Sequence, residues 1–214
     1  MVDWAVARNT TKRLHEYCKS LSTPLAFPAF GEGGELLLII TYTMESLNSI
    51  LLTRLTRFNL SELAELYKRA GSATAVIEHK RDIREILPEA STHLIQALKD
   101  IDSLREWAEQ ELEYDRLHNI EPICMNDERY PQRLKECIDA PILLYYLGNA
   151  DLNNRHVINI IGTRHCTTYG QDIIHSFVRE LKALCPDVLI LSGLAYGVDI
   201  HAHRAALENG FETV

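Results

Sequence analysis

One unit occurs twice between residues 157 and 214: a short apolar run, a turn that contains glycine, and a segment with helical periodicity. The first run, residues 157–161, leads into Gly-Thr-Arg, and the second, residues 188–191, leads into Ser-Gly-Leu-Ala-Tyr-Gly. Both runs are rich in Val, Ile and Leu with little polar alternation, which is typical of parallel strands covered on both faces. The repeat predicts an α/β fold with a parallel sheet and flanking helices, in which ligands bind at the carboxyl ends of the strands.

Length and composition are those of an ordinary globular protein, with 214 residues, 46% of them hydrophobic and 24% charged. Five cysteines without a C-x-x-C pair argue against a disulfide framework or a zinc ribbon and fit a reducing cytoplasm. The longest strongly apolar run, residues 36–40, is far shorter than the roughly 20 residues that cross a bilayer, and no signal peptide is apparent. The sequence therefore predicts a cytoplasmic protein without a membrane partner.

The net charge of −8 argues against a nucleic-acid binder that works by bulk attraction. Most of this charge lies in residues 81–156, which hold 9 basic and 16 acidic residues. An anion must therefore be bound at a local pocket, where Arg side chains and helix amino termini act at short range.

Three regions follow one another along the chain. Residues 1–45 form a lead-in of uncertain structure. A second methionine, Met44, lies at its end, which fits a true start at Met44 and a start codon assigned too early at Met1. Residues 46–116 carry apolar side chains at helical spacing and predict a helical domain. Residues 117–214 hold the N-terminal part of the predicted sheet domain.

Local signals mark where several helices begin and end. In the helical domain, Ser61 is the expected cap of one helix, Gly71 its end, and Pro88 interrupts the next. In the sheet domain, Asp199 is the expected cap of the last helix and Gly210 its end.

Two further short apolar segments, residues 121–125 and 142–147, are predicted strands that extend or edge the later sheet. The helix after the first motif is expected to bury one apolar stripe, made of Ile173, Ile174, Phe177, Val178, Leu181 and Leu184.

Three stretches are specific in combination: YPQRLKECIDAPILLYYLGNADL, INIIGTRHCTTYG and VLILSGLAYGVDIHAHRAALENG. Through them, residues 120–214 resemble the DNA-processing protein A family (DprA, also called Smf). The resemblance implies an extended Rossmann-like domain that binds single-stranded DNA, forms a homodimer and helps to load the RecA recombinase during natural transformation. It also implies that residues 46–116 correspond to a small helical domain related to sterile alpha motif (SAM) or helix-hairpin-helix modules.

The chain departs from the family pattern in two places. Residues 56–60 and 87–91 replace the helix-hairpin-helix glycines that expose backbone N–H groups to phosphate, so DNA contact by the helical domain is not expected. The chain also ends at Val214, inside the expected third strand, and lacks the family's winged-helix tail. This predicts a fragment, a truncated gene product or a folding-incompetent relic, with uncovered strand edges that favour aggregation.

The first motif has a physical rationale of its own. Gly162 lets the backbone turn tightly towards a ligand, and the next helix presents N–H groups to an anion. Arg164 can grip a phosphate bidentately, while Thr163 and Thr167 supply hydroxyl donors, with Thr167 at the helix cap. Gly170 permits close packing. The alternative is a structural turn with a solvated arginine.

The second motif is expected to line the same crevice with Ser192 and Gly193, and Gly197 lets the chain approach it. Asp199 is expected to cap its helix, because a carboxylate beside a phosphate is unfavourable. His201 and His203 lie about 200° apart around a helix and cannot face one ligand together, so no metal site is predicted.

Catalytic signals are thin. The sequence around Ser192 is not G-x-S-x-G, neither turn is a P-loop, and Cys166 is expected to fill a turn; no cofactor and no enzyme activity are predicted. The preferred function is a non-enzymatic binder of single-stranded DNA, with bases stacked on Tyr169 or Tyr196. The alternative is a Rossmann-like enzyme resembling those that cleave nucleoside monophosphates.

Overall fold

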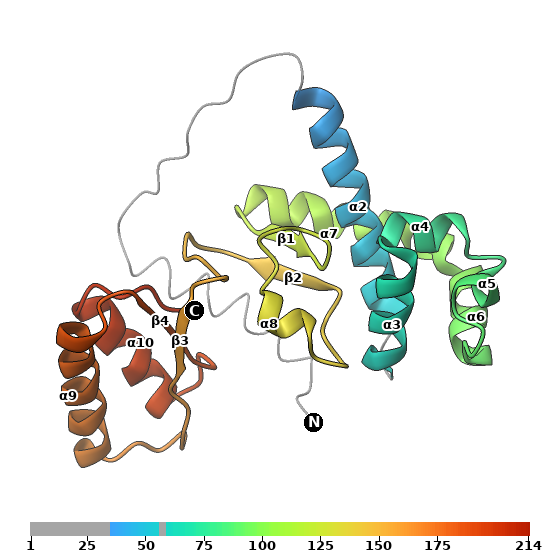
Figure 1. The fold of residues 1–214 in the computed structure, drawn as a ribbon. Coiled ribbons are helices and arrows are strands. Elements are labelled where there is room, and N and C mark those ends of the chain that lie inside the picture. Colours follow the sequence, from blue (N-terminus) through green and yellow to red (C-terminus); the bar gives the residue numbers. More distant parts are fainter. Residues whose placement is uncertain (1–34, 56–58) are drawn as a thin grey trace. The chain divides into compact units, whose positions relative to one another are not determined.

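The computed structural model describes residues 35–55 and 59–214, with side chains from residue 44 onward (Figure 1). The lead-in up to residue 34 and the turn at residues 56–58 lie outside the described residues. No helix within the described ranges is long and apolar enough to cross a membrane.

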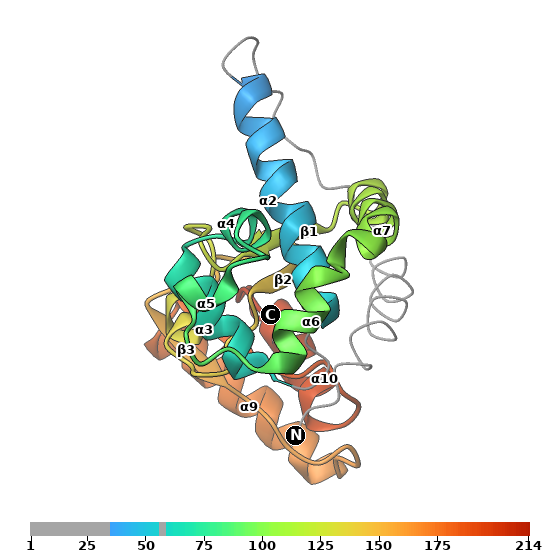
Figure 2. The same ribbon diagram turned by 90° about the vertical axis from the view of Figure 1, so that its right-hand side faces the viewer.

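The first region is helical, as predicted, although its first helix begins at Glu35 rather than near residue 46. The elements are α2 (Glu35–Leu55), α3 (Leu60–Ala70), α4 (Ala73–Glu78), α5 (Ile83–Ile86), α6 (Thr92–Lys99), the 3-10 helix η1 (Ile101–Leu104) and α7 (Arg105–Leu117). In both Figure 1 and Figure 2, α3 and α4 lie beside the carboxyl-terminal half of α2. The predicted apolar positions that are buried are Leu47, Ile50, Leu51, Leu63, Leu66, Tyr67, Leu94, Leu98 and Ile101.

The helix boundaries follow local chemistry, with one correction. Asn59, not Ser61, caps α3, because its side chain accepts a hydrogen bond from the backbone N–H of Glu62 at 3.1 Å. Gly71 ends α3 in the left-handed conformation, with φ of 85°, as expected of a glycine at this position. Helix α5 ends at Ile86, two residues before Pro88.

Strands β1 (Glu121–Cys124) and β2 (Leu143–Tyr146) pair antiparallel with each other, with Ile123 opposite Leu144. Among the described residues they form a sheet of their own, so the expectation that they edge the later sheet is wrong. The physical reason is burial, because the apolar side chains of these strands join the core of the helices instead. Between the strands lies the short helix α8 (Gln132–Lys135).

Strands β3 (His156–Asn159) and β4 (Val188–Leu191) pair in parallel, as the repeated unit predicts. Ile190 forms a further parallel bridge with Thr213, so the end of the chain begins a third strand beside β4. Only β4 is largely covered; β3 is half-exposed because, within the described residues, it pairs on one side only.

Helices α9 (Thr168–Leu184) and α10 (Val198–Glu208) pack against each other and, with β4, share a second core. Half of the predicted stripe of α9 faces this core: Ile174, Val178 and Leu181 are buried. The other half is exposed at Ile173, Phe177 and Leu184, because these residues lie on a neighbouring face of the helix. Gly210, with φ of 68°, follows the end of α10, as predicted.

Candidate nucleic-acid interface

The turn after β3 holds the first motif. Thr167 caps α9, as predicted: its hydroxyl oxygen accepts a hydrogen bond from the N–H of Gly170 at 3.2 Å. The hydroxyl oxygen of Thr163 accepts from the N–H of His165, also at 3.2 Å. Both threonines use their oxygens as acceptors, which leaves the hydroxyl protons to donate to an anion. Gly170 leaves room for the neighbouring Cys166, since a Cβ atom there would lie 2.9 Å from the sulfur.

The turn after β4 holds the second motif. Ser192 donates its hydroxyl proton to the carbonyl oxygen of Ile160 at 2.7 Å, so this side chain ties the two strand ends together. Asp199 does not cap α10, contrary to expectation, because the capping position is Gly197. Its buried carboxylate instead accepts a hydrogen bond from the N–H of Ala195 at 3.3 Å and so braces the turn.

The two turns touch each other, and glycines make the contact. The backbone N–H of Val198 donates to the carbonyl oxygen of Thr163 at 3.1 Å. A Cβ atom at Gly162 would lie 2.7 Å from the Val198 side chain, and one at Gly197 would collide with the Thr163 carbonyl. The structure therefore brings the two motifs into one crevice, as the topology predicts for neighbouring parallel strands.

The second turn also carries backbone strain. Leu194 has φ of 53°, a left-handed conformation that is uncommon for a residue with a branched side chain. Gly193 lets the Asp199 carboxylate approach closely, because a Cβ atom there would lie 2.8 Å from Asp199 Oδ2 and the carboxylate would have to shift. Neither Leu194 nor Val198 was predicted to be part of the crevice; for Val198 the only signal in the sequence is its position directly after Gly197.

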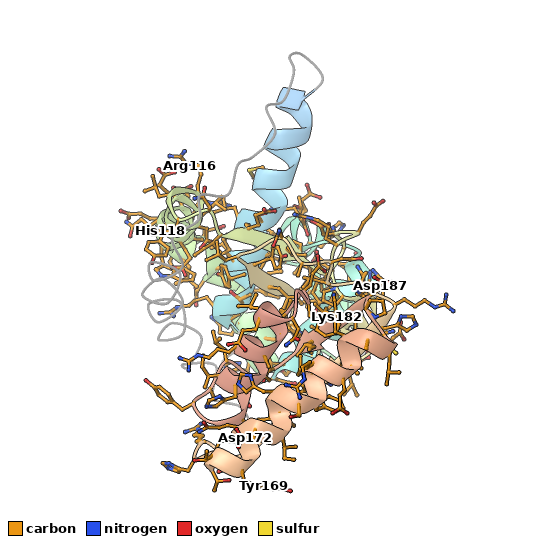
Figure 3. All side chains as sticks on the ribbon, turned by 90° about the vertical axis from the view of Figure 1, so that its left-hand side faces the viewer. Arg116, His118, Tyr169, Asp172, Lys182 and Asp187 are labelled. Carbon is orange, nitrogen blue, oxygen red and sulfur yellow. The ribbon has the colours of Figure 1, made fainter. Side chains whose placement is uncertain are left out.

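Arg164 is the cation that the crevice presents. Its side chain is exposed and forms no hydrogen bond or ion pair with the described residues. By contrast, Lys182 donates to the carbonyl oxygens of Pro186 and Gly210 and lies 4.4 Å from the Phe211 ring centroid. Arg179 donates to the hydroxyl of Ser176 at 3.3 Å. Figure 3 shows Lys182 far along α9 from the end that carries Tyr169.

Exposed aromatic rings flank both turns. Tyr169 lies in the first turn of α9 and is 75% exposed, and Tyr196 lies in the second motif and is 70% exposed. Exposed tyrosine rings are a type of side chain on which nucleobases stack.

The two histidines of the second motif have different neighbours. The Nδ1 atom of His203 lies 2.7 Å from the hydroxyl of Thr213, and burial lowers the pKa of this imidazole. Burial also lowers the pKa of His201, and the nearby Arg204 acts in the same direction. No group of three His, Cys, Asp or Glu side chains in the described ranges is arranged to hold a metal ion.

Comparison with known proteins confirms the resemblance that the motifs predict. Residues 121–214 match the sequence profile of the family described as DNA recombination-mediator protein A. DNA processing protein DprA of Streptococcus pneumoniae is 40% identical over 88 residues, which are 41% of this chain and 30% of that protein. DNA processing protein DprA of Bacillus subtilis is 31% identical over 100 residues, 46% of this chain and 33% of that protein. Protein Smf of Synechocystis is 31% identical over 109 residues, 49% of this chain and 27% of that protein.

The fold is also found in a solved structure. The X-ray structure of DprA from Streptococcus pneumoniae aligns with a TM-score of 0.54 and 24% identity, covering 81% of this chain and 54% of that one. This confirms the predicted fold class, an N-terminal helical region followed by part of a Rossmann-like sheet with flanking helices. The matched segments span only about a third of the length of the curated relatives.

Proposed function

Because residues 121–214 are similar to the DprA family throughout both motifs, we propose that the crevice between the two turns binds the phosphate backbone of single-stranded DNA. The observation that carries the proposal is the direct contact of the turns at Gly162, Gly197 and Val198, beside an arginine that has no partner among the described residues. The close approach at the two glycines brings backbone N–H groups, threonine hydroxyls and the Arg164 guanidinium into the same crevice.

The binding chemistry follows from these donors. Arg164 supplies a planar fork for one phosphate, and Thr163 and Thr167 supply hydroxyl protons. The amino-terminal ends of α9 and α10 both lie at these turns and add a partial positive charge. Gly193 completes the second turn, whereas Ser192 contributes chiefly by holding the strand ends together. Tyr169 and Tyr196 are the proposed stacking platforms for bases.

The proposed cellular role is that of the matched relatives, which are named for DNA processing and for mediating recombination. The protein holds single strands during DNA uptake and transformation and passes them to the RecA recombinase. It acts in the cytoplasm and as a homodimer. These roles are those expected of relatives of which the matched segments cover about a third.

Two parallel assays test the proposal. Labelled oligo-dT is titrated at several salt concentrations, and nucleoside monophosphates are incubated with the same preparation while released base is measured. We expect salt-sensitive binding of oligo-dT without base release. Base release without oligo-dT binding would show that the crevice is an enzyme site instead.

A further inference from the structure

A groove of about 530 Å³ lies in the helical region, between the turn into α5 and one face of α6. From α6 it is lined by Thr92, Gln96 and Lys99, whose i, i+4, i+7 spacing places them on one side of the helix. From the other side it is lined by Arg81 and Arg84, both exposed. We call this the cationic groove.

Two cations of the groove have no partner within the described chain. Arg84 and Lys99 are exposed and form no hydrogen bond or ion pair with the described residues. Arg81 is close enough to help lower the pKa of Asp102 through its charge, but it forms no direct ion pair with this carboxylate, which pairs with Lys80 instead. The groove thus presents three positive side chains that are not neutralised by direct contacts.

Other arginines of the same region are neutralised, which sets the groove apart. Arg69 pairs with Glu65 and Glu89, Arg116 pairs with Glu113, and Arg129 pairs with Glu121 and Asp127. Residues 81–156 carry 16 acidic and 9 basic side chains, so a cationic groove here runs against the local charge.

The starts of α4 and α6, two helix starts near the groove, already hold a carboxylate of the chain. The carboxylate of Glu45 accepts from the N–H groups of Ala73 and Thr74 at the start of α4. The carboxylate of Glu62 accepts from the N–H of Ser91 before α6. A phosphate at either helix start would be repelled by the carboxylate already bound there.

We infer that the cationic groove is a second contact for the sugar–phosphate backbone of a single DNA strand held in the crevice. This inference rests on the proposed function of the crevice and names a further stretch of the same ligand. Arg81, Arg84 and Lys99 bind phosphates by charge, and the Thr92 hydroxyl and Gln96 amide serve as polar partners for sugar and base edges. Ile83 and Ile95 give the groove an apolar floor.

The contact is weak and independent of sequence, for two reasons. The groove has no aromatic lining residue in the described chain, so bases do not stack there. The carboxylates of Asp82 and Glu85 also line it and oppose the cations. Affinity from the groove is therefore additive to that of the crevice and sensitive to salt.

The test compares oligo-dT of increasing length on the full chain. The double variant Arg84→Gln/Lys99→Gln should bind oligomers of about 20 nucleotides roughly fivefold more weakly at low salt, with a salt slope smaller by about 1.4, or about 0.7 for each lost phosphate contact. Oligomers of about six nucleotides, short enough for the crevice alone, should bind this variant and the wild type equally. The matched control Arg69→Gln/Arg116→Gln removes two exposed but ion-paired arginines and should change neither length series.

A second variant separates binding from folding. Asp82→Asn/Glu85→Gln removes the opposing carboxylates and should tighten binding of the long oligomers by about twofold to threefold, which a merely damaged fold cannot do. Wild-type affinity of both double variants at every length, while Arg164→Ala still weakens binding, would overturn the groove and leave the crevice standing. Wild-type affinity in the Arg164→Ala variant would instead refute the proposed function of the crevice.

Discussion

The helical region and the α/β region differ in the groups that accept hydrogen bonds from the backbone N–H groups at the starts of their helices. At α4, the Glu45 carboxylate accepts hydrogen bonds from Ala73 N at 2.7 Å and Thr74 N at 3.0 Å. Before α6, Glu62 accepts from Ser91 N at 2.6 Å. In the α/β region, α9 is capped only by the neutral Thr167 hydroxyl, and α10 begins at Gly197 without a side-chain cap.

The difference indicates where an external anion could bind, because a helix start that already holds a carboxylate of the same chain disfavours a second anion. In the helical region, carboxylates from distant positions complete the helix starts and stabilise the fold. In the α/β region, Asp199 lies in the first turn of α10, but its carboxylate accepts from the Ala195 N–H of the preceding turn rather than from an N–H of the helix start. Arg164, which has no partner among the described residues, adds positive charge. The first arrangement serves stability, and the second is suited to an external phosphate.

The largest effect is expected from Gly197→Ala. A Cβ atom there would lie 2.5 Å from the Arg164 carbonyl carbon, at φ of 86°, so the two turns must separate. We expect a loss of more than about 3 kcal/mol in the free energy of unfolding of the α/β region, with loss of oligo-dT binding. Urea unfolding followed by circular dichroism measures the first effect.

Gly210→Ala is the matched control for this change. Gly210 also has a positive φ, of 68°, but nothing lies within 4 Å of its Cβ position. The cost should be about 1 kcal/mol, with DNA binding unchanged. Equal costs for the two glycines would show that contact between the turns does not matter.

Glu45→Gln should have the next largest effect, confined to the helical region. The Glu45 carboxylate accepts from the Tyr67 hydroxyl at 2.7 Å and from the Thr74 hydroxyl at 2.6 Å, in addition to two backbone N–H groups. A neutral amide with a single oxygen cannot accept all four bonds, so we expect a loss of about 2–3 kcal/mol in stability. Thermal unfolding tests this against Glu109→Gln, an exposed glutamate that should change stability by less than about 0.5 kcal/mol.

DNA binding provides the sharper outcome for Glu45. If the helical region stabilises the fold through this carboxylate, folded Glu45→Gln protein should bind short oligo-dT like the wild type. A gain of salt-sensitive affinity in this variant would mean that the start of α4 becomes an anion site once the carboxylate is removed.

Local features of the fold were predictable from sequence, and the distant carboxylates were not. Thr167, Gly71 and Gly210 act within one or two turns of their own positions, so residue type and spacing identify them. Glu45 and Glu62 act on N–H groups 28 and 29 residues away, and local sequence gives no signal for such pairs. The antiparallel pairing of β1 with β2 was missed for the same reason, since burial against the helices decides it.

The candidate site shows the same limit. The topology of parallel strands predicted that both glycine turns meet, and they do. The use of Ser192 to join the strand ends and of Asp199 to brace the turn depends on atoms that the fold brings together. A serine or aspartate after a strand fits either role, so sequence alone could not choose between ligand contact and support.

Arg164→Ala tests whether the helix starts of the α/β region bind an external phosphate. Arg164 has no internal partner among the described residues, so its loss should leave the fold intact while one phosphate contact disappears. We expect oligo-dT affinity to fall about tenfold, with a salt slope smaller by about 0.7. Binding is measured by fluorescence anisotropy across salt concentrations, with Arg179→Ala as the control on the same region. Wild-type affinity in a folded Arg164→Ala protein would refute the crevice as the DNA site.

The smallest effect concerns Asp115, a carboxylate of the helical region that lacks the partners of Glu45 and Glu62. Its side chain is 2% exposed and its Oδ2 atom has no hydrogen-bond partner among the described residues. Burial raises the pKa of this carboxyl to about 7, and the nearby Glu111 adds to the shift. Since the folded pKa lies above the unfolded one, the stabilising contribution of this group is present in full at low pH and is lost as pH rises towards 7.

Asp115→Asn removes this pH dependence and so shows whether an unbonded carboxylate weakens the helical region. The neutral amide should stabilise the protein by about 1 kcal/mol at pH 8, where the aspartate must ionise in a buried position, and should give no gain at pH 4. Thermal unfolding at the two pH values, with Glu109→Asn as an exposed control, measures the difference. An equal effect at both pH values would show that Asp115 does not titrate between pH 4 and pH 8 in the folded state. Ionisation of this unbonded carboxylate would then not weaken the helical region.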